Sequence, residues 1–359
     1  MSKIKILHVT SVHPRDDTRI SYRECKCLAE NPDYEVTLLV FDGKENTKEF
    51  SFRIADGGNL HCHSFLARIM LGFWRTLSFC IKNKPNIVHL HDPELIFIGG
   101  LLSRLGYIVV YDVHENVVED IATKDWLPVF FRKVFQKIFP ALENFLMLNS
   151  SVILAETSYL ENYSKFRSVT VLRNFPEVDI LSERVVSKKR NKFTVCYIGA
   201  ISVNRGFYNY LSALEKMRDI GSDVRFLCIG KAPKHILDCP RVVSAINSGW
   251  LEMTGRLAIA DAVEQLSSCH VGLSVLSNEG NFSASYPTKI FEYMSMSLPV
   301  VCSNFPLYKS IVLNNDCGLV VKPDDSNQLS QTLIYCEKNL EKLLTFGNNG
   351  LLSVKESYS

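Results

Sequence analysis

The chain has 359 residues, of which 47% are hydrophobic and 22% charged, and its formal net charge is only +2. This length suggests two domains, and this composition is that of a soluble globular protein. The near-neutral charge excludes a global attraction to nucleic acid, so any basic function has to rest on a local patch.

The first strand-like segment, Met1 to Thr10, is too short and too interrupted by polar residues to be a signal peptide. No run of about 18 uncharged apolar residues occurs, so we expect no membrane-spanning segment. Eleven cysteines are scattered without a C-x-x-C pair, and the closest two, Cys25 and Cys27, fall in a predicted helix. We therefore expect reduced thiols and a cytoplasmic protein, rather than a disulfide framework or a zinc site.

Short apolar runs alternate with helical periodicity in the first half, as buried parallel strands alternate with crossover helices. The predicted strands are Ile4–Ser11, Glu35–Phe41, Ile87–His91, Ile108–His114, Ser151–Glu156 and Thr170–Arg173. The predicted helices are Thr18–Glu30, Glu94–Leu105 and one or two helices within Trp126–Leu148. Repeated β-α units predict a doubly wound parallel sheet with helices on both faces.

The pattern breaks at a polar, basic segment, SERVVSKKRNK (residues 182–192), which we interpret as an interdomain linker. A second alternating series follows. Its predicted strands are Phe193–Ile198, Arg225–Ile229, Trp250–Met253, Val271–Leu276, Pro299–Cys302 and Gly318–Val321. Its predicted helices are Gly206–Arg218, Ile259–Ser268, Pro287–Ser297, Tyr308–Leu313 and Asn327–Asn339. The fold class is therefore α/β, with Rossmann-like domains at residues 1–180 and 181–359 and a cleft between them.

Three strands of the first half end in ionisable residues, and the carboxyl ends of parallel strands lie at one edge of a sheet. These residues are His13, Arg15, Asp16, Asp17 and Arg19, then His89, His91, Asp92 and Glu94, then Asp112, His114, Glu115 and Asn116. A single histidine in such a place is usually structural, but several strand ends of this kind favour a functional site. Such a cluster is also compatible with a metal-binding site, although no H-x-x-x-H or similar ligand spacing supports one.

The segment Trp126–Leu148 has six aromatic residues interleaved with basic ones, and the stretch Leu66–Arg75 is similar in kind. Basic, aromatic and amphipathic stretches suit the surface of an anionic membrane. A helix packed on the sheet is the alternative interpretation of the first segment.

Neither half has G-x-G-x-x-G after its first strand, which disfavours a dinucleotide dehydrogenase. The first strand of the second half instead ends at Gly199, and Arg205 and Gly206 follow just before a predicted helix. This arrangement could place Arg205 beside a phosphate at a helix N-terminus. An exposed arginine in an ordinary helix-start loop is the alternative.

The stretch Ser285–Val301 reads as the loop, helix and strand that follow a buried strand. Pro287 suits the start of a helix, where no backbone N–H is needed. Glu292, one turn into that helix, could accept hydrogen bonds from ribose hydroxyls, while the helix N-terminus favours phosphates. The alternative is that Lys289 and Glu292 form a surface ion pair on an ordinary crossover helix.

A series of motifs, taken together, resembles one family of enzymes. In order they are HPRDDTR with the R-x-C-K helix after it, HLHDPEL, YDVHEN, AETSYLENY, VLRNFPE, YIGAISVNRGF, PTKIFEYMSMSLPVVCSNFP and GLVVKPDD. They extend over nearly the whole chain, which resembles a GT-B-fold retaining glycosyltransferase of family four. The resemblance is to the branch that builds bacterial surface polysaccharides such as O-antigen or capsule.

The resemblance implies metal-independent transfer of a sugar, with retention and without a cofactor, from a nucleotide-sugar to a hydroxyl group. We expect the acceptor to be a lipid-linked glycan, and the protein to lie peripherally on the inner face of the cytoplasmic membrane. No D-x-D follows a strand, which agrees with the expected absence of a metal.

Residue by residue, the family's ribose-binding glutamate matches Glu292, its phosphate-binding basic residue matches Arg205, and its histidine near the transferred sugar matches His114. The resemblance therefore predicts His114 and Glu292 as catalytic residues. The predicted donor-binding residues are Gly199, Arg205, Gly206, Ser285, Tyr286, Thr288, Lys289 and Glu292. The predicted acceptor-side residues are His13, Arg15, Asp17, Arg19, His91, Asp92 and Glu115.

The sequence departs from the family's pattern at two places. Ala284 stands where a glutamate near the transferred sugar is usual, and Ala200 stands where an arginine is usual. Lys289 could partly replace that arginine. The chain also ends at Ser359, before the long C-terminal helix that usually crosses back to the first domain.

Two other functions fit the same architecture. A nucleotide-sugar epimerase would form product from the nucleotide-sugar alone, without an acceptor. A two-lobed sugar-binding protein usually needs export, for which no signal peptide is found in this sequence.

Overall fold

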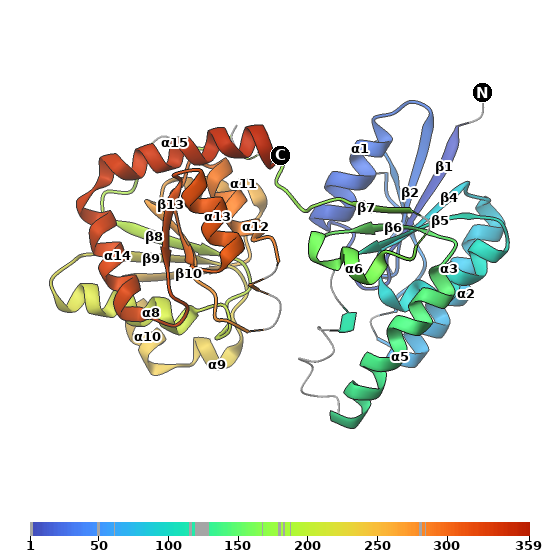
Figure 1. The fold of residues 1–359 in the computed structure, drawn as a ribbon, viewed down its shortest axis with the longest axis horizontal. Coiled ribbons are helices and arrows are strands. Elements are labelled where there is room, and N and C mark those ends of the chain that lie inside the picture. The colour runs from blue at the N-terminus through green and yellow to red at the C-terminus, as the bar shows by residue number, and fades with distance from the viewer. Residues whose placement is uncertain are drawn as a thin grey trace. The chain divides into compact units, whose positions relative to one another are not determined.

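The computed structural model describes residues 3–48, 51–60, 62–114, 117–118, 129–166, 168–178, 181, 184–186, 188–279, 282–283 and 285–359. The chain is divided into two compact units, Met1–Asn174 and Phe175–Ser359 (Figure 1). The domain boundary predicted at residue 180 lies a few residues further along the chain. Each unit is described by itself, and the predicted cleft between them stays a prediction.

Parallel strands alone form the main sheet of the first unit, in the order β3-β2-β1-β4-β5-β6-β7 within the described residues. They are β1 (Ile4–Val9), β2 (Tyr34–Val40), β3 (Arg53–Asp56), β4 (Ile87–Leu90), β5 (Ile108–Val113), β6 (Ser151–Leu154) and β7 (Ser168–Val171). The six predicted strands are present at nearly the predicted bounds. The edge strand β3 was missed, because it is only four residues long and begins and ends with a charged residue.

Helices and short turns connect these strands. They are η1 (Thr18–Cys25), α1 (Lys26–Ala29), α2 (Phe65–Asn83), η2 (Pro93–Leu95), α3 (Ile96–Arg104), α5 (Val129–Met147), η3 (Thr157–Tyr159) and α6 (Leu160–Tyr163). Helix α3 packs against both α2 and α5, as Figure 1 shows. Helix α2 was not predicted, because apolar side chains such as Leu66, Met70 and Trp74 lie on its exposed face and blur its periodicity.

Of all the helices in the described part of the chain, none combines the length and the hydropathy needed to cross a membrane.

The sheet of the second unit is also parallel, in the order β10-β9-β8-β11-β12-β13. Its strands are β8 (Thr194–Ile198), β9 (Arg225–Ile229), β10 (Leu251–Gly255), β11 (Val271–Ser274), β12 (Val300–Ser303) and β13 (Gly318–Val321). Its helices are α8 (Phe207–Asp219), α9 (Lys234–Leu237), α10 (Pro240–Asn247), α11 (Ile259–Ser267), α12 (Thr288–Ser295), α13 (Pro306–Asn314), α14 (Ser326–Lys338) and α15 (Leu340–Ser357). The predicted elements are present, whereas α9, α10 and α15 were not predicted. The predicted fold class, two parallel α/β domains, is confirmed.

The polar segment 182–192 does not behave as a linker. Within it, Lys189 donates hydrogen bonds from Nζ to the carbonyl oxygens of Ser267 (2.9 Å) and Cys269 (2.8 Å), at the end of α11. Val178, just before the segment, is buried in the core of the second unit. The linker prediction was wrong because a lysine can bury its aliphatic stem while its amine binds the last carbonyls of a helix.

Candidate active site

In both sheets the chain winds outward in opposite directions from a central pair of strands. This pair is β1 and β4 in the first unit, and β8 and β11 in the second. In open parallel sheets, the loops after such a pair leave a crevice at the carboxyl edge, and ligands bind there. The residues that follow or end these four strands are therefore the place to look for a site in each unit.

A group of titratable side chains fills the carboxyl edge of the first sheet, and we call it the histidine cluster. It consists of His8, Glu24, His89, His91, Asp112 and His114. Five of these residues are at most 8% exposed, and only His114, with 15% of its side chain exposed, reaches the surface. His8 and His89 are paired in register across β1 and β4, and their ring centroids are 4.5 Å apart. Side chains of this cluster thus occupy the switch point of the first sheet, the place at its carboxyl edge where the chain reverses its winding between β1 and β4.

Asp112 holds His114 in place. Arg19 donates to both Asp112 oxygens, at 2.9 Å from Nη2 and 3.1 Å from Nε, and His114 Nε2 lies 2.9 Å from Oδ2. Burial alone would raise the pKa of Asp112, but the contacts with His114, His91 and Arg19 hold it well below its ordinary value. The ionised carboxylate therefore fixes the position of the His114 ring through its contact with Nε2.

The short helix η1 presents two charged residues to this cluster. Arg19 and Glu24 are five residues apart, and η1 is a π-helix, whose i→i+5 hydrogen bonds stack such residues on one face. Arg19 Nε lies 3.0 Å from Glu24 Oε1. Burial and the nearby Asp112 carboxylate raise the pKa of Glu24 well above its ordinary value.

Burial favours the neutral form of the three buried histidines of the cluster. Burial is the main cause that lowers the pKa of His8, His89 and His91, and the charge of a neighbouring histidine adds to it. Within the described residues, His89 Nε2 and Glu24 Oε2 make no hydrogen bond, while Glu24 Oε1 has the ion pair with Arg19. Buried polar atoms without partners are uncommon and cost free energy, so they require an explanation.

Asp92 organises the loop after β1. Its Oδ2 accepts a hydrogen bond from the Thr10 hydroxyl at 2.8 Å, and its Oδ1 lies 2.8 Å from His13 Nδ1. Burial alone would raise the pKa of Asp92, but His13, a backbone amide and Thr10 outweigh it and lower this pKa to about 2. The His13 ring lies 5.1 Å from that of His114. The structure thus brings together the predicted residues His13, His91, Asp92 and His114.

Three other predicted acceptor-side residues have partners within the first unit. Arg15 forms two hydrogen bonds of 2.7 Å with Asp42. Asp17 caps η1, because its side chain accepts from the amides of Arg19 and Ile20. Arg19 itself is buried against Asp112. Glu115 and Asn116, predicted from the same strand end as His114, lie outside the described residues.

Sequence reasoning did not select His8 and Glu24. His8 lies inside the apolar run of the first strand and Glu24 inside a predicted helix, so neither follows a strand end. Superposing the strand sequences ILHV and IVHL would have aligned His8 with His89, which is their register in the sheet.

Two cations lie beside a glycine at the carboxyl edge of the second sheet. A Cβ on Gly199, whose φ is +123°, would be 2.7 Å from Lys289 Cε, so the lysine lies directly against this backbone. Burial and the positive charge of Arg205 lower the pKa of Lys289 to about 8, although Glu292 opposes them. Arg205 also interacts with the Tyr197 hydroxyl. A diphosphate beside both cations would relieve their repulsion.

Helix α12 begins at the same edge, with Pro287 at its N-cap. The predicted Ser285, Thr288 and Lys289 are half-buried around its start, and Glu292 is half-buried one turn further along. Tyr286 packs its ring against those of Phe291 and Phe175, at 6.2 and 5.8 Å between centroids. Tyr286 thus contributes to the core of the second unit, whereas Ala284 lies outside the described residues.

Gly206 keeps the loop after β8 close to the end of β11. Its φ is +79°, and a Cβ there would lie 2.1 Å from the carbonyl oxygen of Val275. Any other residue would separate the two loops of the switch point. Gly199 and Gly206, both predicted from the sequence, thus shape the backbone around Arg205.

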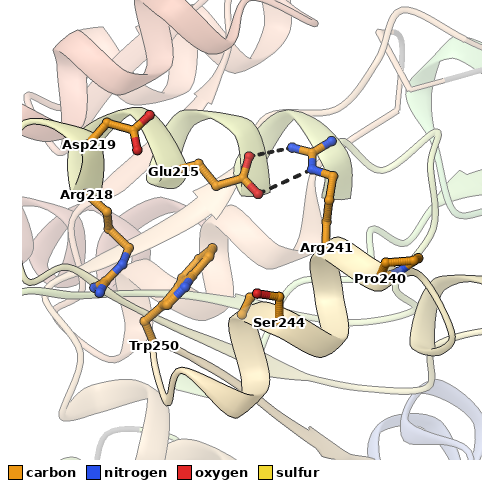
Figure 2. A pocket seen from close by; sticks show the side chains of 8 residues that line it. Glu215, Arg218, Asp219, Pro240, Arg241, Ser244 and Trp250 are labelled. Carbon is orange, nitrogen blue, oxygen red and sulfur yellow. Dashed lines mark hydrogen bonds and ion pairs between the residues drawn. The ribbon is translucent and has the colours of Figure 1, made fainter.

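A separate pocket of about 440 Å³ lies on the second unit between α8 and α10 (Figure 2). Glu215 and Arg241 form an ion pair of 2.6 Å across it. The pocket extends to Trp250, which precedes β10 and so marks the amino edge of the sheet. None of the predicted site residues lines this pocket.

Residues 192–339 match the family model described as "Glycosyl transferases group 1", which is most of the second unit and less than half of the chain. No curated protein matches the chain.

Solved structures resemble the chain over both units. Sucrose-phosphate synthase from Thermosynechococcus elongatus has a TM-score of 0.77 and 14% identity, with 99% of this chain and 95% of that one covered. HepE from Anabaena, in complex with UDP and glucose, has a TM-score of 0.72 and 13% identity, with 99% and 96% covered. WaaG, described as a glycosyltransferase involved in lipopolysaccharide biosynthesis, has a TM-score of 0.69 and 12% identity, with 99% and 97% covered. At these identities the likeness concerns the fold, which is GT-B.

Proposed function

We propose that the chain is a glycosyltransferase that moves a sugar from a nucleotide-sugar to an acceptor hydroxyl. The observation that carries the proposal is the pair of cations, Arg205 and Lys289, beside Gly199 at the switch point of the second sheet. The family match in this same unit supports it, as do the complexes of HepE with UDP and glucose.

The donor would be bound by the second unit. Arg205 and Lys289 bind the diphosphate as charge-assisted donors, and the N-terminus of α12 adds its dipole. Glu292, one turn into α12, accepts hydrogen bonds from the ribose hydroxyls. Ser285 and Thr288 contribute polar groups at the start of the helix. No metal is required at the phosphates, because the two cations stabilise the charge that develops there.

The transfer itself breaks the bond between the sugar C1 and the diphosphate oxygen. The acceptor oxygen bonds to C1 on the same face, so the configuration is retained. The acceptor proton passes to the leaving diphosphate oxygen, and a protein base is therefore not needed. His114, fixed by Asp112, positions the sugar through a hydrogen bond that strengthens as positive charge develops on the ring.

The acceptor would be a lipid-linked glycan at the inner face of the cytoplasmic membrane. On α2, Leu66, Met70 and Trp74 recur every four residues and are 62–72% exposed. On α5, Phe130 and Ile138 are 71% and 56% exposed on one face. Exposed lysines such as Lys133 and Lys137 flank them. Two helices that both pack against α3, with exposed apolar stripes and nearby basic residues, suit an anionic lipid surface. A lipid-linked glycan acceptor is consistent with the branch of the family that builds bacterial surface polysaccharides.

Vesicle flotation tests the membrane part. Binding should rise with the fraction of anionic lipid and fall with salt. Met70→Glu with Ile138→Glu should abolish it. The matched control is Leu352→Glu on α15, where an equally exposed leucine of the second unit is replaced. Equal flotation with neutral and anionic vesicles contradicts the proposal.

A thermal shift against UDP-, GDP-, dTDP- and CMP-sugars tests the donor part. The true donor at about 100 times its Kd should stabilise the protein by about 2.7 kcal/mol. Lys289→Gln should remove that stabilisation. Product formation must then require an acceptor. A product made from donor alone indicates an epimerase, and binding without turnover with any acceptor indicates a sugar-binding protein.

A further inference from the structure

We propose that the histidine cluster binds one divalent transition-metal ion of the zinc type, held by His8, Glu24, His89 and His91. The proposal concerns the first unit alone and does not depend on the transferase activity. It departs from the expectation, drawn from the family resemblance and from sequence spacing, that the chain binds no metal. The four ligands come from β1, η1 and the end of β4, so no short motif could contain them.

The distances among the four ligand atoms fit one ion. Glu24 Oε2 lies 4.0 Å from His8 Nδ1, 3.8 Å from His89 Nε2 and 3.9 Å from His91 Nε2. These separations exceed the limit of about 3.2 Å for a good hydrogen bond. Ligands of one tetrahedral zinc ion, each about 2.0–2.2 Å from the metal, are roughly 3.3–3.5 Å apart. His8 Nδ1 and His91 Nε2 are 2.9 Å apart and share a hydrogen bond, which the ion would replace. The four measured separations lie on both sides of the roughly 3.3–3.5 Å expected between ligands of one zinc ion. Shifts of a few tenths of an ångström in each side chain would complete the coordination of the ion.

An ion would also supply the partners that the cluster lacks. His89 Nε2 and Glu24 Oε2 are buried, face each other, and make no hydrogen bond to any described residue. Imidazole and carboxylate can both present lone pairs to the same point in space. A cation at that point is a partner for both. All four ligand atoms lie within 4.8 Å of one another, so small side-chain shifts would bring each to bonding distance of one ion.

The residues behind the ligands orient them as second-layer partners do in metal sites. His91 Nδ1 lies 3.4 Å from Asp112 Oδ2, which leaves Nε2 to face the ion. Arg19 lies 3.0 Å from Glu24 Oε1, which leaves Oε2 to face it. A carboxylate behind a ligating imidazole fixes its tautomer. Three imidazoles and one carboxylate suit zinc and similar ions, whereas magnesium and calcium prefer oxygen ligands throughout.

The ion would be structural. Its four ligands are at most 8% exposed and complete a tetrahedral shell without an open position. It would tie β1, β4 and η1 together at the switch point. Through His91 and Asp112 it would also stiffen the support of His114, the member of the cluster that reaches the surface.

Metal analysis of the whole protein, purified without chelators, tests the proposal. We expect one zinc-type ion per chain. After removal by a chelator, titration with Co²⁺ should give one equivalent of binding with the visible absorption of four-coordinate Co²⁺. Zinc should restore a melting temperature that the chelator has lowered by a few degrees. A parent protein without metal, and without a Co²⁺ spectrum, overturns the proposal.

Variants locate the site. His89→Asn should lose the ion, while His270→Asn should keep it, because His270 is a half-buried histidine of the second unit that accepts from the Thr194 amide. His114→Asn should also keep it. Loss of the ion in His114→Asn with retention in His89→Asn would assign it to His91, Asp112 and His114 instead, and overturn the site proposed here. If His89→Asn fails to fold, the parent's Co²⁺ titration and melting temperature still decide.

Discussion

The two units share one strand order around their central pair, yet the carboxyl edges of their sheets are built from different material. In the first unit, β1, η1, β4 and β5 bring histidines and carboxylates into contact beneath the surface. In the second unit, β8 ends at Gly199, and the cations Arg205 and Lys289 come from the loop and helix that follow the strands. The edge of the first sheet is therefore lined by buried side chains. The edge of the second sheet is lined by the backbone at Gly199, with two half-buried cations nearby.

This difference predicts that substitutions at the first edge affect the stability of the fold, whereas substitutions at the second affect ligand binding. Charged groups out of water are tolerable only with their partners present, so replacing one of them destabilises the fold. Half-buried cations that meet a ligand cost little stability when replaced, but their loss weakens the ligand. The same topology therefore predicts two different responses to substitution, one in each unit.

Replacing an arginine in each unit gives the largest contrast. Arg19→Met leaves Asp112 and Glu24 buried without their counter-charge, and should lower the free energy of unfolding by about 3–5 kcal/mol. Arg205→Met should change it by no more than about 0.5 kcal/mol. Urea denaturation of the two variants measures both. Similar losses in the two variants would remove the distinction between the units.

His114 should matter for turnover rather than for donor affinity. His114→Ala should lower kcat by about 10²-fold, which is about 2.7 kcal/mol, with the donor Kd little changed, as for an interaction made mainly in the transition state. His114→Gln keeps a side chain that can form hydrogen bonds and should recover part of the rate. Steady-state kinetics and donor titration measure the two quantities. A parental kcat in His114→Ala would exclude this residue from the reaction.

Glu292 should show the reverse behaviour. Glu292→Ala removes a charged acceptor of hydrogen bonds and should weaken nucleotide-sugar binding by about 1.5–3 kcal/mol, with the melting temperature of the unliganded protein unchanged. Isothermal titration calorimetry gives the affinity. Binding as tight as in the parent would show that the ribose is held elsewhere.

The smallest effect is a pH dependence in the second unit. Lys289 has a pKa of about 8, and the diphosphate binds its protonated form, so donor binding raises this pKa further. Affinity is therefore full below pH 8 and is lost as the pH rises through it. Between pH 7 and pH 9 the Kd should rise roughly tenfold, which is about 1.4 kcal/mol. Lys289→Arg stays protonated and should give a flat profile; a parent profile that is equally flat would contradict the assignment.

The alternation of short apolar runs was enough to predict both sheets, because buried parallel strands are apolar on both faces. The edge strand β3 and helix α2 do not show the usual patterns of a buried strand and a helix with a polar outer face. Strand β3 has charged ends, and α2 exposes a row of apolar side chains. The position of Gly199, Arg205 and Lys289 at the carboxyl edge of the sheet could be predicted because they follow strands or start helices, while their role in donor binding stays a prediction. His8 and Glu24 could not, because only the register of β1 with β4 and the π-helical turn of η1 bring them into the cluster.

Polar residues after a strand also do not reveal which way they face. Asp17 was predicted to be at the acceptor side, yet its oxygen accepts from its own helix. Arg15 was predicted in the same way and pairs with Asp42. A loop sequence shows that a polar group is present, while the choice between solvent, backbone and site depends on neighbours that are distant in the chain.

The way the histidine cluster is distributed along the chain has a consequence for protein synthesis. His8 and His91, which touch, are 83 residues apart, and His114 follows later still. At about 5–20 residues per second, a ribosome takes roughly 4–17 s to release the chain from His8 to His91, just after β4. During that time β1 can pair with β2, but its other edge has no strand beside it. That edge, with His8 on it, is then open to pairing with other nascent chains. The first unit therefore emerges with one edge of β1 exposed to aggregation. When β4 is released, it pairs with that edge and brings His8, His89 and His91 together.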